Sequence, residues 1–213
     1  MTALLKNKVQ LFYVYDPMCS WCWGYRPTWL ALQNALKATL PDIEISYLLG
    51  GLAPDSEQPM SQDMQQFIET TWQKIARQLN TQFNFDFWQQ NQARRSTYPA
   101  CRACLLARES NKELEMIFSI QQAYYLQAKN PSDNSLLITL ASQIGLQKSV
   151  FSEQLSAPLT QQKLMTEIDK AHALPIQGFP SLVLTINDQN HAIPIDYQQW
   201  QHSFDTIKQI LQC

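Results

Sequence analysis

The sequence predicts an α/β fold in which a βαβ unit near the start and a ββα unit near the end are separated by a long, all-helical segment. Runs of β-branched and aromatic residues occur only near the two ends of the chain, whereas the segment from Met60 to Ala173 has the apolar spacing of helices. In addition, 45% of the 213 residues are hydrophobic, which is enough to bury a sizeable core in one domain, or in one domain with an insertion.

The first fifty residues predict the βαβ unit. Residues 9–15 (VQLFYVY) form a β-branched and aromatic run that is typical of a buried strand. Apolar residues three and four positions apart predict a helix that begins near Cys22 and is stopped by Pro41. Residues 43–49 (IEISYLL) predict a second strand. A crossover of this kind makes the two strands parallel, so the sheet is expected to be mixed.

The middle of the chain predicts helices only. Prolines and glycines such as Pro131, Gly145 and Pro158 separate the successive apolar stripes. We expect helices over residues 61–79, 84–94, 100–129, 134–145, 149–156 and 160–173.

The end of the chain predicts a β-hairpin followed by a helix. Residues 181–186 (SLVLTI) and 192–195 are the expected strands, and residues 187–190 are the expected turn between them. Residues 197–211 carry apolar side chains on one helical face.

These elements predict two domains. Residues 1–58 together with residues 160–213 are expected to form the sheet domain, and residues 59–159 an inserted helical domain. The inserted helices would cover the sheet as a lid or as a side domain.

Composition and charge give no support for several classes of partner. The formal net charge of −2 gives no general reason to expect a nucleic acid or a membrane surface. The apolar run over residues 11–15 is too short for the hydrophobic region of a signal peptide, and no stretch approaches the ~18 apolar residues of a membrane span. We therefore expect a soluble, cytoplasmic protein, and we make no prediction about its oligomeric state.

The stretch Cys19-Ser20-Trp21-Cys22 places two cysteines between a predicted strand and a predicted helix. Helix N-termini favour thiolates through their free N–H groups and their dipole, and cysteines in such CxxC pairs have pKa values lowered from ~8.5 to ~3.5–7.5. Cys19 is therefore the candidate nucleophile. Cys22, one turn further on, is within disulfide reach and is the candidate resolving thiol. Trp21 is expected to border the substrate.

A lone CxxC pair is also compatible with half of a zinc site or with a buried structural pair. Two features favour redox chemistry. The first is the strand–CxxC–helix context. The second is Gly178-Phe179-Pro180, directly before a predicted strand. A cis bond at this proline would leave the backbone of Phe179 free to pair with an extended substrate, whereas the alternative is an ordinary trans proline at the start of a strand.

Together, DPMCSWCWGY after the first strand, the helical insertion and GFPSLVL late in the chain resemble the DsbA-like branch of the thioredoxin superfamily. The closest resemblance is to its cytoplasmic members, predicted disulfide oxidoreductases or isomerases that share D-P-x-C-x-W-C-W-G, and it covers essentially the whole chain. It implies a thioredoxin fold, with Cys19 as nucleophile, Cys22 as resolving thiol, a cis Pro180 that faces the pair, and a Phe179 backbone that binds substrate. We expect neither a metal nor an organic cofactor.

The expected partner is a protein or a small-molecule thiol or disulfide, with glutathione among the candidates. Periplasmic DsbA has Pro-His between its cysteines, whereas this chain has Ser20-Trp21. The missing histidine removes a cation that would stabilise a thiolate, so we expect a less oxidising couple. Two alternatives are a glutathione-dependent transferase or isomerase of the kappa-class or hydroxychromene carboxylate isomerase type, whose members typically lack the second cysteine, and a non-catalytic peptide-binding module.

A second CxxC pair, formed by Cys101 and Cys104, follows Pro99 and is expected in the first turn of a helix. Three interpretations compete: simple packing of small apolar residues, an auxiliary redox pair, and a zinc site shared with the first pair. Zinc ribbons usually separate their two pairs by ~15–20 residues, and the gap is far longer here.

Other polar residues are weaker candidates for a functional role. Asp16 caps the helix, packs, or assists proton transfer. His172 is a candidate proton shuttle or a solvated residue at a helix end. The pair Arg94-Arg95 is expected to be solvated, because it is too short to indicate nucleic-acid binding. Cys213 is expected to be exposed.

Overall fold

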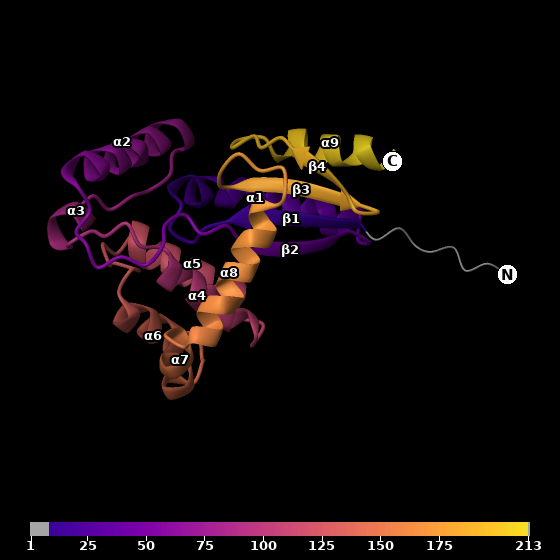
Figure 1. The fold of residues 1–213 in the computed structure, drawn as a ribbon. Helices are drawn as coiled ribbons and strands as arrows, with labels where there is room; N and C mark the ends of the chain where they lie inside the picture. The colour runs from indigo at the N-terminus through magenta and orange to yellow at the C-terminus, as the bar shows by residue number, and fades with distance from the viewer. Residues whose placement is uncertain (1–8, 213) are drawn as a thin grey trace.

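The computed structural model describes residues 9–212, and Figure 1 shows how the elements are arranged. Predictions that involve residues 1–8 and Cys213 lie outside the described residues. The described chain forms a four-stranded sheet with helices on both faces (Figure 1). Within residues 9–212, no helix is both long and apolar enough to cross a membrane.

The sheet is mixed, as the predicted crossover requires, and its strand order is β2-β1-β3-β4. β1 (Val9–Tyr15) runs parallel to β2 (Glu44–Leu49) and antiparallel to β3 (Ser181–Ile186), and β3 forms a hairpin with β4 (Gln189–Ile193). Because β1 is central and covered on both faces, residues 11–15 are all buried, which explains their unbroken apolar run.

Helices cover the two faces of the sheet unequally. α1 (Ser20–Thr39) and α9 (Trp200–Leu211) pack against each other on one face, and α8 (Pro158–His172) crosses the other face (Figure 1). Alternate β1 side chains point to opposite faces, so Tyr13 belongs to the cluster beneath α1, whereas Val14 belongs to the cluster beneath α8. The carboxyl end of β1 leads directly into the start of α1.

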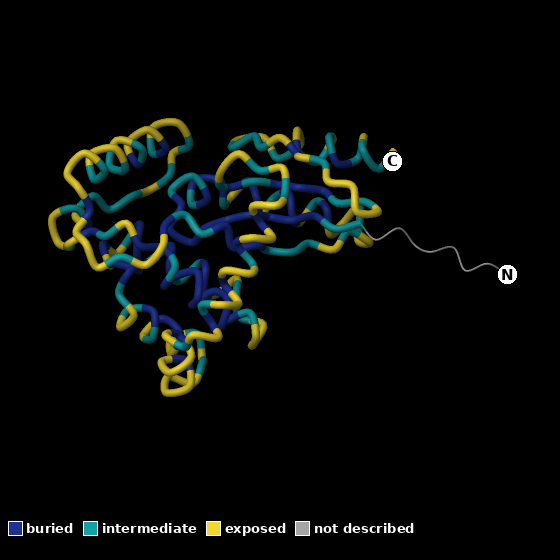
Figure 2. Tube along the Cα trace, in the orientation of Figure 1, coloured by how far each residue is buried: buried dark blue, intermediate teal, exposed yellow. Residues whose placement is uncertain are grey.

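The segment between β2 and β3 is helical, as predicted, apart from an isolated bridge between Pro59 and Arg94. Figure 2 shows that α4 and α5 are largely buried, whereas α2 is exposed along its outer side. One hydrophobic cluster extends from the sheet into these helices, so the proposed boundary at residues 59–159 stays a prediction. The helices are α2 (Gln62–Leu79), α3 (Phe87–Gln90), α4 (Tyr98–Arg108), α5 (Glu113–Tyr125), α6 (Asn134–Gln143) and α7 (Lys148–Leu155).

The helix expected over residues 100–129 is in fact two helices, α4 and α5. The chain turns between them at Asn111, whose φ of 57° lies in the left-handed region that asparagine tolerates. The N–H of Lys112 donates to the carbonyl of Ala107 and closes the turn. The apolar spacing continues across this turn, which is why the sequence pattern does not reveal it.

The helix expected over residues 84–94 shortens to the four residues of α3. Phe83 lies in coil and Phe85 in a turn just before α3, and their rings lie 5.1 and 6.1 Å from the ring of Trp72. The packing of aromatic rings around a buried tryptophan thus outweighs the local helix preference.

The hairpin turn is shorter than expected. It consists of Asn187 and Asp188 alone, which both have positive φ values, 48° and 64°. Two-residue turns of this kind match the right-handed twist of the flanking strands. β4 therefore begins at Gln189 and not at residue 192.

Gly51, two residues after the end of β2, combines a left-handed backbone with a crowded environment. Its φ is +66°, and an added Cβ would lie 2.4 Å from Cδ1 of Ile168 and 2.9 Å from Cε1 of Tyr98. Gly145 offers a matched control, because its φ is +84° but its added Cβ would meet only the Lys112 Nζ, at 3.8 Å.

We expect Gly145→Ala to lower the free energy of unfolding by about 1–2 kcal/mol, the cost of a left-handed non-glycine residue. Gly51→Ala should cost about 1–3 kcal/mol more, because Ile168 and Tyr98 must also move. Urea denaturation of the two variants measures this difference. Equal losses would mean that the packing around Gly51 adapts without cost.

Candidate active site

Cys19 is the N-cap of α1, immediately before the first helical residue. Its backbone is extended (φ −77°, ψ 117°), and its Sγ accepts a hydrogen bond from the backbone N–H of Cys22 at 3.4 Å. Its own N–H donates to the carbonyl of Asp16, which fixes the turn between β1 and α1. The sulfur thus lies where free N–H groups and the helix dipole stabilise negative charge.

The second neighbour of Cys19 comes from 160 residues further along the chain. The Phe179–Pro180 peptide bond is cis, and the carbonyl oxygen of Phe179 accepts a hydrogen bond from the Cys19 Sγ at 3.3 Å. The structure therefore brings together the helix start and the proline loop that the sequence singled out. As a thiol, the Cys19 sulfur donates to the carbonyl of Phe179. As a thiolate, it still accepts from the N–H of Cys22.

Cys22 is more deeply buried than Cys19, with 1% of its surface exposed against 6%. Burial raises the pKa of the Cys22 thiol well above its ordinary value, and the neighbouring Cys19 raises it further. Cys22 is therefore protonated under conditions in which an exposed thiol ionises. This asymmetry suits one thiol to attack first and the other to follow.

A fully buried carboxylate, Asp16, connects the motif to the inserted helices. Its Oδ1 accepts from the N–H of Met18 at 2.8 Å, and its Oδ2 accepts from the N–H of Leu52 at 2.7 Å and from the hydroxyl of Thr97 at 2.6 Å. Because Cys19 is the N-cap, Asp16 does not cap α1. Burial raises the pKa of the Asp16 carboxyl, and the hydrogen bond from Thr97 opposes that shift in part.

The two residues between the cysteines contact different parts of the molecule. The Oγ of Ser20 accepts a hydrogen bond from the indole N–H of the buried Trp72 on α2, at 2.9 Å. The ring of Trp21 lies 5.0 Å from the ring of Tyr197, with the Nζ of Lys74 at 5.6 Å from the indole. The inserted helix α2 therefore packs directly on the CxxC turn.

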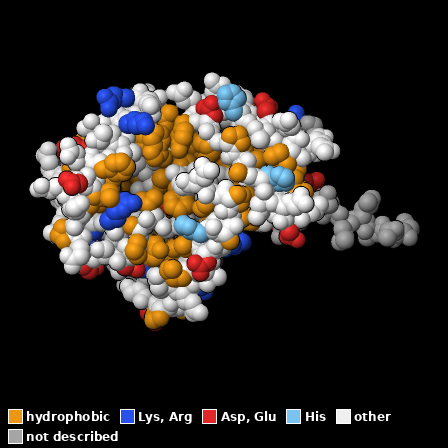
Figure 3. Space-filling view, turned by 45° about the horizontal axis from the view of Figure 1, so that its top comes forward, with side chains coloured by type: hydrophobic (Ala, Val, Ile, Leu, Met, Phe, Trp, Pro, Cys, Tyr) orange, Lys and Arg blue, Asp and Glu red, His pale blue; other side chains and the backbone are white. Residues whose placement is uncertain are grey.

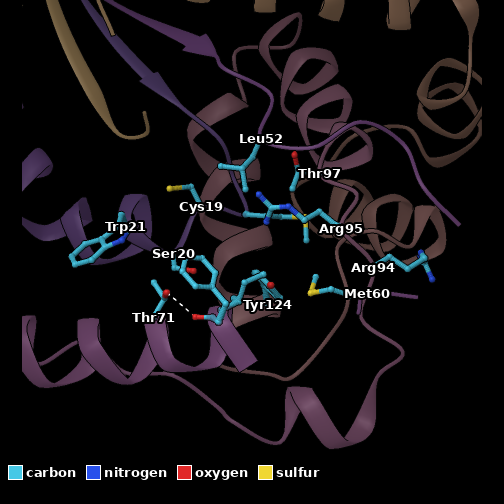
Figure 4. A pocket seen from close by; sticks show the side chains of 13 residues that line it. Cys19, Ser20, Trp21, Leu52, Met60, Thr71, Arg94, Arg95, Thr97 and Tyr124 are labelled. Carbon is cyan, nitrogen blue, oxygen red and sulfur yellow. Dashed lines mark hydrogen bonds between the residues drawn. The ribbon is translucent and has the colours of Figure 1, made fainter. Parts of the chain in front are cut away.

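A cavity of about 210 Å³ opens beside Cys19, between the CxxC turn and α2 (Figure 4). Its wall is mostly apolar, and Phe67 at its edge is 66% exposed, so apolar surface continues outward along α2. The described residues that line it are Met18, Cys19, Ser20, Trp21, Leu52, Met60, Phe67, Ile68, Thr71, Arg94, Arg95, Thr97 and Tyr124. Neither Phe179 nor Pro180 lines this cavity, and it is the carbonyl of Phe179 that contacts the Cys19 Sγ.

Two arginines on the cavity wall were missed by the sequence analysis. Arg94 and Arg95 were expected to be a solvated pair, and the structure places both beside the Cys19 cavity. The nearest signal in the sequence was their position just before Ser96-Thr97, on the loop that reaches Asp16. Sequence spacing alone does not tell which side of that loop faces Cys19.

Cys101 and Cys104 lie deep in α4, and neither has exposed surface. The Cys101 Sγ donates to the Asp16 Oδ2 at 3.4 Å, and burial raises the pKa values of both thiols well above the ordinary value. Their auxiliary redox role stays a prediction. The residues that the structure describes contain no cluster of three or more His, Cys, Asp or Glu side chains able to hold a metal ion.

His172 contacts the proline loop. Its Nε2 lies 2.9 Å from the carbonyl of Gly50, and its ring lies 6.2 Å from the ring of Phe179. It therefore supports the loop that faces Cys19, and its role in proton transfer stays a prediction.

Comparison with known proteins assigns the chain to a family and identifies structures with a similar fold. Residues 12–202 match the family model described as Thioredoxin, and the chain belongs to that family. The fold is the DsbA-like form of the thioredoxin fold that the sequence predicted.

Three relatives illustrate the range of the family. A Nitrosomonas europaea protein provisionally assigned as a protein disulfide isomerase is 24% identical, with a TM-score of 0.83 over 96% of this chain and 98% of the other. The cytosolic disulfide reductase DsbM from Pseudomonas aeruginosa is 21% identical, with a TM-score of 0.75 over 96% and 100%, and it has also been solved with GSH. The ClpXP adapter protein SpxH from Bacillus subtilis is 21% identical over 97% of this chain and 67% of its own length.

The raised pKa of Asp16 has a consequence for stability. The folded protein takes up a proton at Asp16 at a higher pH than the unfolded chain does, so this residue makes folding more favourable as the pH falls through the raised pKa toward the ordinary value of 3.8. Asp16→Asn removes this contribution. It also places the side-chain N–H groups of asparagine against the backbone N–H and hydroxyl groups that donate to Asp16.

We therefore expect Asp16→Asn to lower the free energy of unfolding by about 1–3 kcal/mol at neutral pH. The difference from the wild type should grow as the pH falls through the window just described, and urea denaturation at several pH values measures it. Asp205→Asn, an exposed change on α9, is the control and should behave like the wild type throughout. A difference that stays constant with pH would mean that Asp16 has the same pKa in both states.

Proposed function

We propose that this protein is a thiol–disulfide oxidoreductase in which Cys19 is the nucleophile and Cys22 the resolving thiol. The observation that carries the proposal is the position of the Cys19 Sγ, which accepts from the N–H of Cys22 at the start of α1 and faces the carbonyl of Phe179 at 3.3 Å. The buried, protonated Cys22 thiol lies one helical turn further on and reacts only in the second step.

The reaction takes place in two exchange steps. The Cys19 thiolate attacks one sulfur of a substrate disulfide, forms a mixed disulfide and expels the other substrate sulfur as a thiolate. Cys22 then gives up its proton to the substrate thiolate expelled in the first step, or to solvent, and attacks the Cys19 Sγ, which releases the second substrate thiolate and leaves a Cys19–Cys22 disulfide. Two electrons have passed to the substrate, and the same steps in reverse oxidise a dithiol.

Substrate recognition involves both sides of Cys19. The Phe179 carbonyl, next to the cis Pro180, accepts a hydrogen bond from the substrate backbone once the Cys19 thiol has ionised. Trp21 borders the substrate from the cavity side. A protein thiol can extend along the apolar surface at Phe67, and a small thiol such as glutathione can enter the cavity.

We propose a direction of exchange from the residues between the cysteines together with the expected cytoplasmic compartment. Ser20 and Trp21 place no cation between the cysteines, where DsbA has a histidine, so we propose a couple that is less oxidising than that of DsbA. We place the protein in the cytoplasm, where glutathione keeps most thiols reduced. There, we propose, it acts as a reductase or isomerase. Support comes from the fold shared with the cytosolic reductase DsbM. The exchange needs neither a metal nor an organic cofactor.

Variants of the two cysteines test the mechanism. Cys22→Ser should accumulate a mixed disulfide at Cys19 with a model disulfide, because nothing resolves it, and turnover should fall to the background rate. Cys19→Ser should form no adduct at all. Mass spectrometry of the non-reduced protein detects the adduct, and a coupled assay of glutathione reduction measures turnover.

The alternatives give different results. Full activity of Cys22→Ser on an electrophile–glutathione pair would favour a transferase or isomerase. Peptide binding without any exchange would favour the non-catalytic module. An adduct on Cys22 in the Cys19→Ser variant would reverse the assigned roles.

The second cysteine pair can be tested in the same assay. Cys101 and Cys104 have no exposed surface, so we expect the double change to alanine to leave the exchange rate unchanged while it lowers stability. The wild type is the control, with urea denaturation run in parallel. A large loss of turnover in a fully folded double variant would assign this pair an auxiliary redox role.

A further inference from the structure

The Cys19 cavity carries one cation that nothing else in the described chain neutralises. Arg94 forms an ion pair with Asp133. Its neighbour Arg95 has no hydrogen-bond or ion-pair partner among residues 9–212. Figure 4 shows the Arg95 side chain pointing into the cavity toward Leu52, whereas the Arg94 side chain points outward.

The surroundings of Arg95 are positive and apolar. None of the described residues that line the cavity is an aspartate or a glutamate. Lys74 places a second cation near this cavity, 5.6 Å from the ring of Trp21, which lines it. Figure 3 shows basic side chains at the border of a broad apolar surface on this side of the molecule. A carboxylate that enters the cavity therefore meets the positive charge of Arg95 and no competing negative side chain on the wall.

From this juxtaposition we infer that Arg95 forms a carboxylate subsite next to Cys19, and that the preferred small substrates are thiols and disulfides of acidic peptides. The guanidinium pairs with a carboxylate of the substrate while the substrate sulfur lies against the Cys19 Sγ. The inference rests on the proposed function, since it specifies which thiols that site takes. Asp16 does not compete for Arg95, because it is buried behind Thr97 and its oxygens already accept hydrogen bonds.

Two disulfides of different charge test the subsite. Glutathione disulfide carries carboxylates, and hydroxyethyl disulfide carries none. The second-order rate constants for reaction with the reduced, full-length protein are measured by stopped flow for the wild type, for Arg95→Gln and, as a control outside the cavity, for Arg77→Gln. Because Arg95 is exposed, its replacement should leave the fold intact, and a thermal melt of each variant verifies this.

We expect Arg95→Gln to lower the rate constant with glutathione disulfide about tenfold, which corresponds to about 1.4 kcal/mol, and to leave that with hydroxyethyl disulfide within about twofold of the wild type. Arg77→Gln should change neither, because Arg77 is exposed on α2 and does not line the cavity. Arg95→Lys should restore part of the preference, since it keeps the charge but loses the planar fork. The wild-type preference should decline as salt is added.

Equal slowing of both disulfides by Arg95→Gln would overturn the subsite, because Arg95 would then act on the reaction of Cys19 itself. No change with either disulfide would overturn it as well. Calorimetric binding of S-methylglutathione to the Cys19→Ser variant separates the two proposals, since it requires no exchange. Binding that depends on Arg95 in a protein without exchange activity would retain the subsite and reject the oxidoreductase.

Discussion

One buried carboxylate organises the site. Asp16 lies at the carboxyl end of the central strand and accepts hydrogen bonds from Met18, Leu52 and Thr97, which belong to the CxxC turn, the loop after β2 and the start of α4. Taking a carboxylate out of water is costly, and strong donors on both oxygens are what offset that cost. The cysteine turn, the cavity loop and the inserted helices thus keep their relative positions through a single side chain.

Around this centre, the reactive groups come from segments far apart in the sequence. α1 supplies Cys19 and its N–H environment, the loop before β3 supplies the Phe179 carbonyl, and α2 supplies the indole that holds Ser20. The inserted helices are therefore part of the site and not only a cover for it. This division lets the cysteine turn keep a constant geometry while the cavity wall determines which thiols reach it.

Much of the fold was predictable because its signals are local. The strand run at residues 9–15, the CxxC spacing and the Gly-Phe-Pro loop depend on near neighbours in the chain, and the structure places Cys19 beside Phe179. The turn at Asn111, which separates α4 from α5, could not be predicted because the apolar spacing continues through it. The partners of Asp16 and the inward direction of Arg95 depend on contacts across tens of residues, which a single sequence does not encode in any local pattern.

The hydrogen bond between Ser20 and Trp72 has a spectroscopic consequence. One indole is anchored beside the cysteine pair and a second, that of Trp21, lies between the cysteines. Disulfides quench excited indoles at short range by accepting an electron, whereas thiols do so far less. The emission of this protein should therefore dim on oxidation and brighten on reduction, so that the chain contains its own optical reporter of electron transfer.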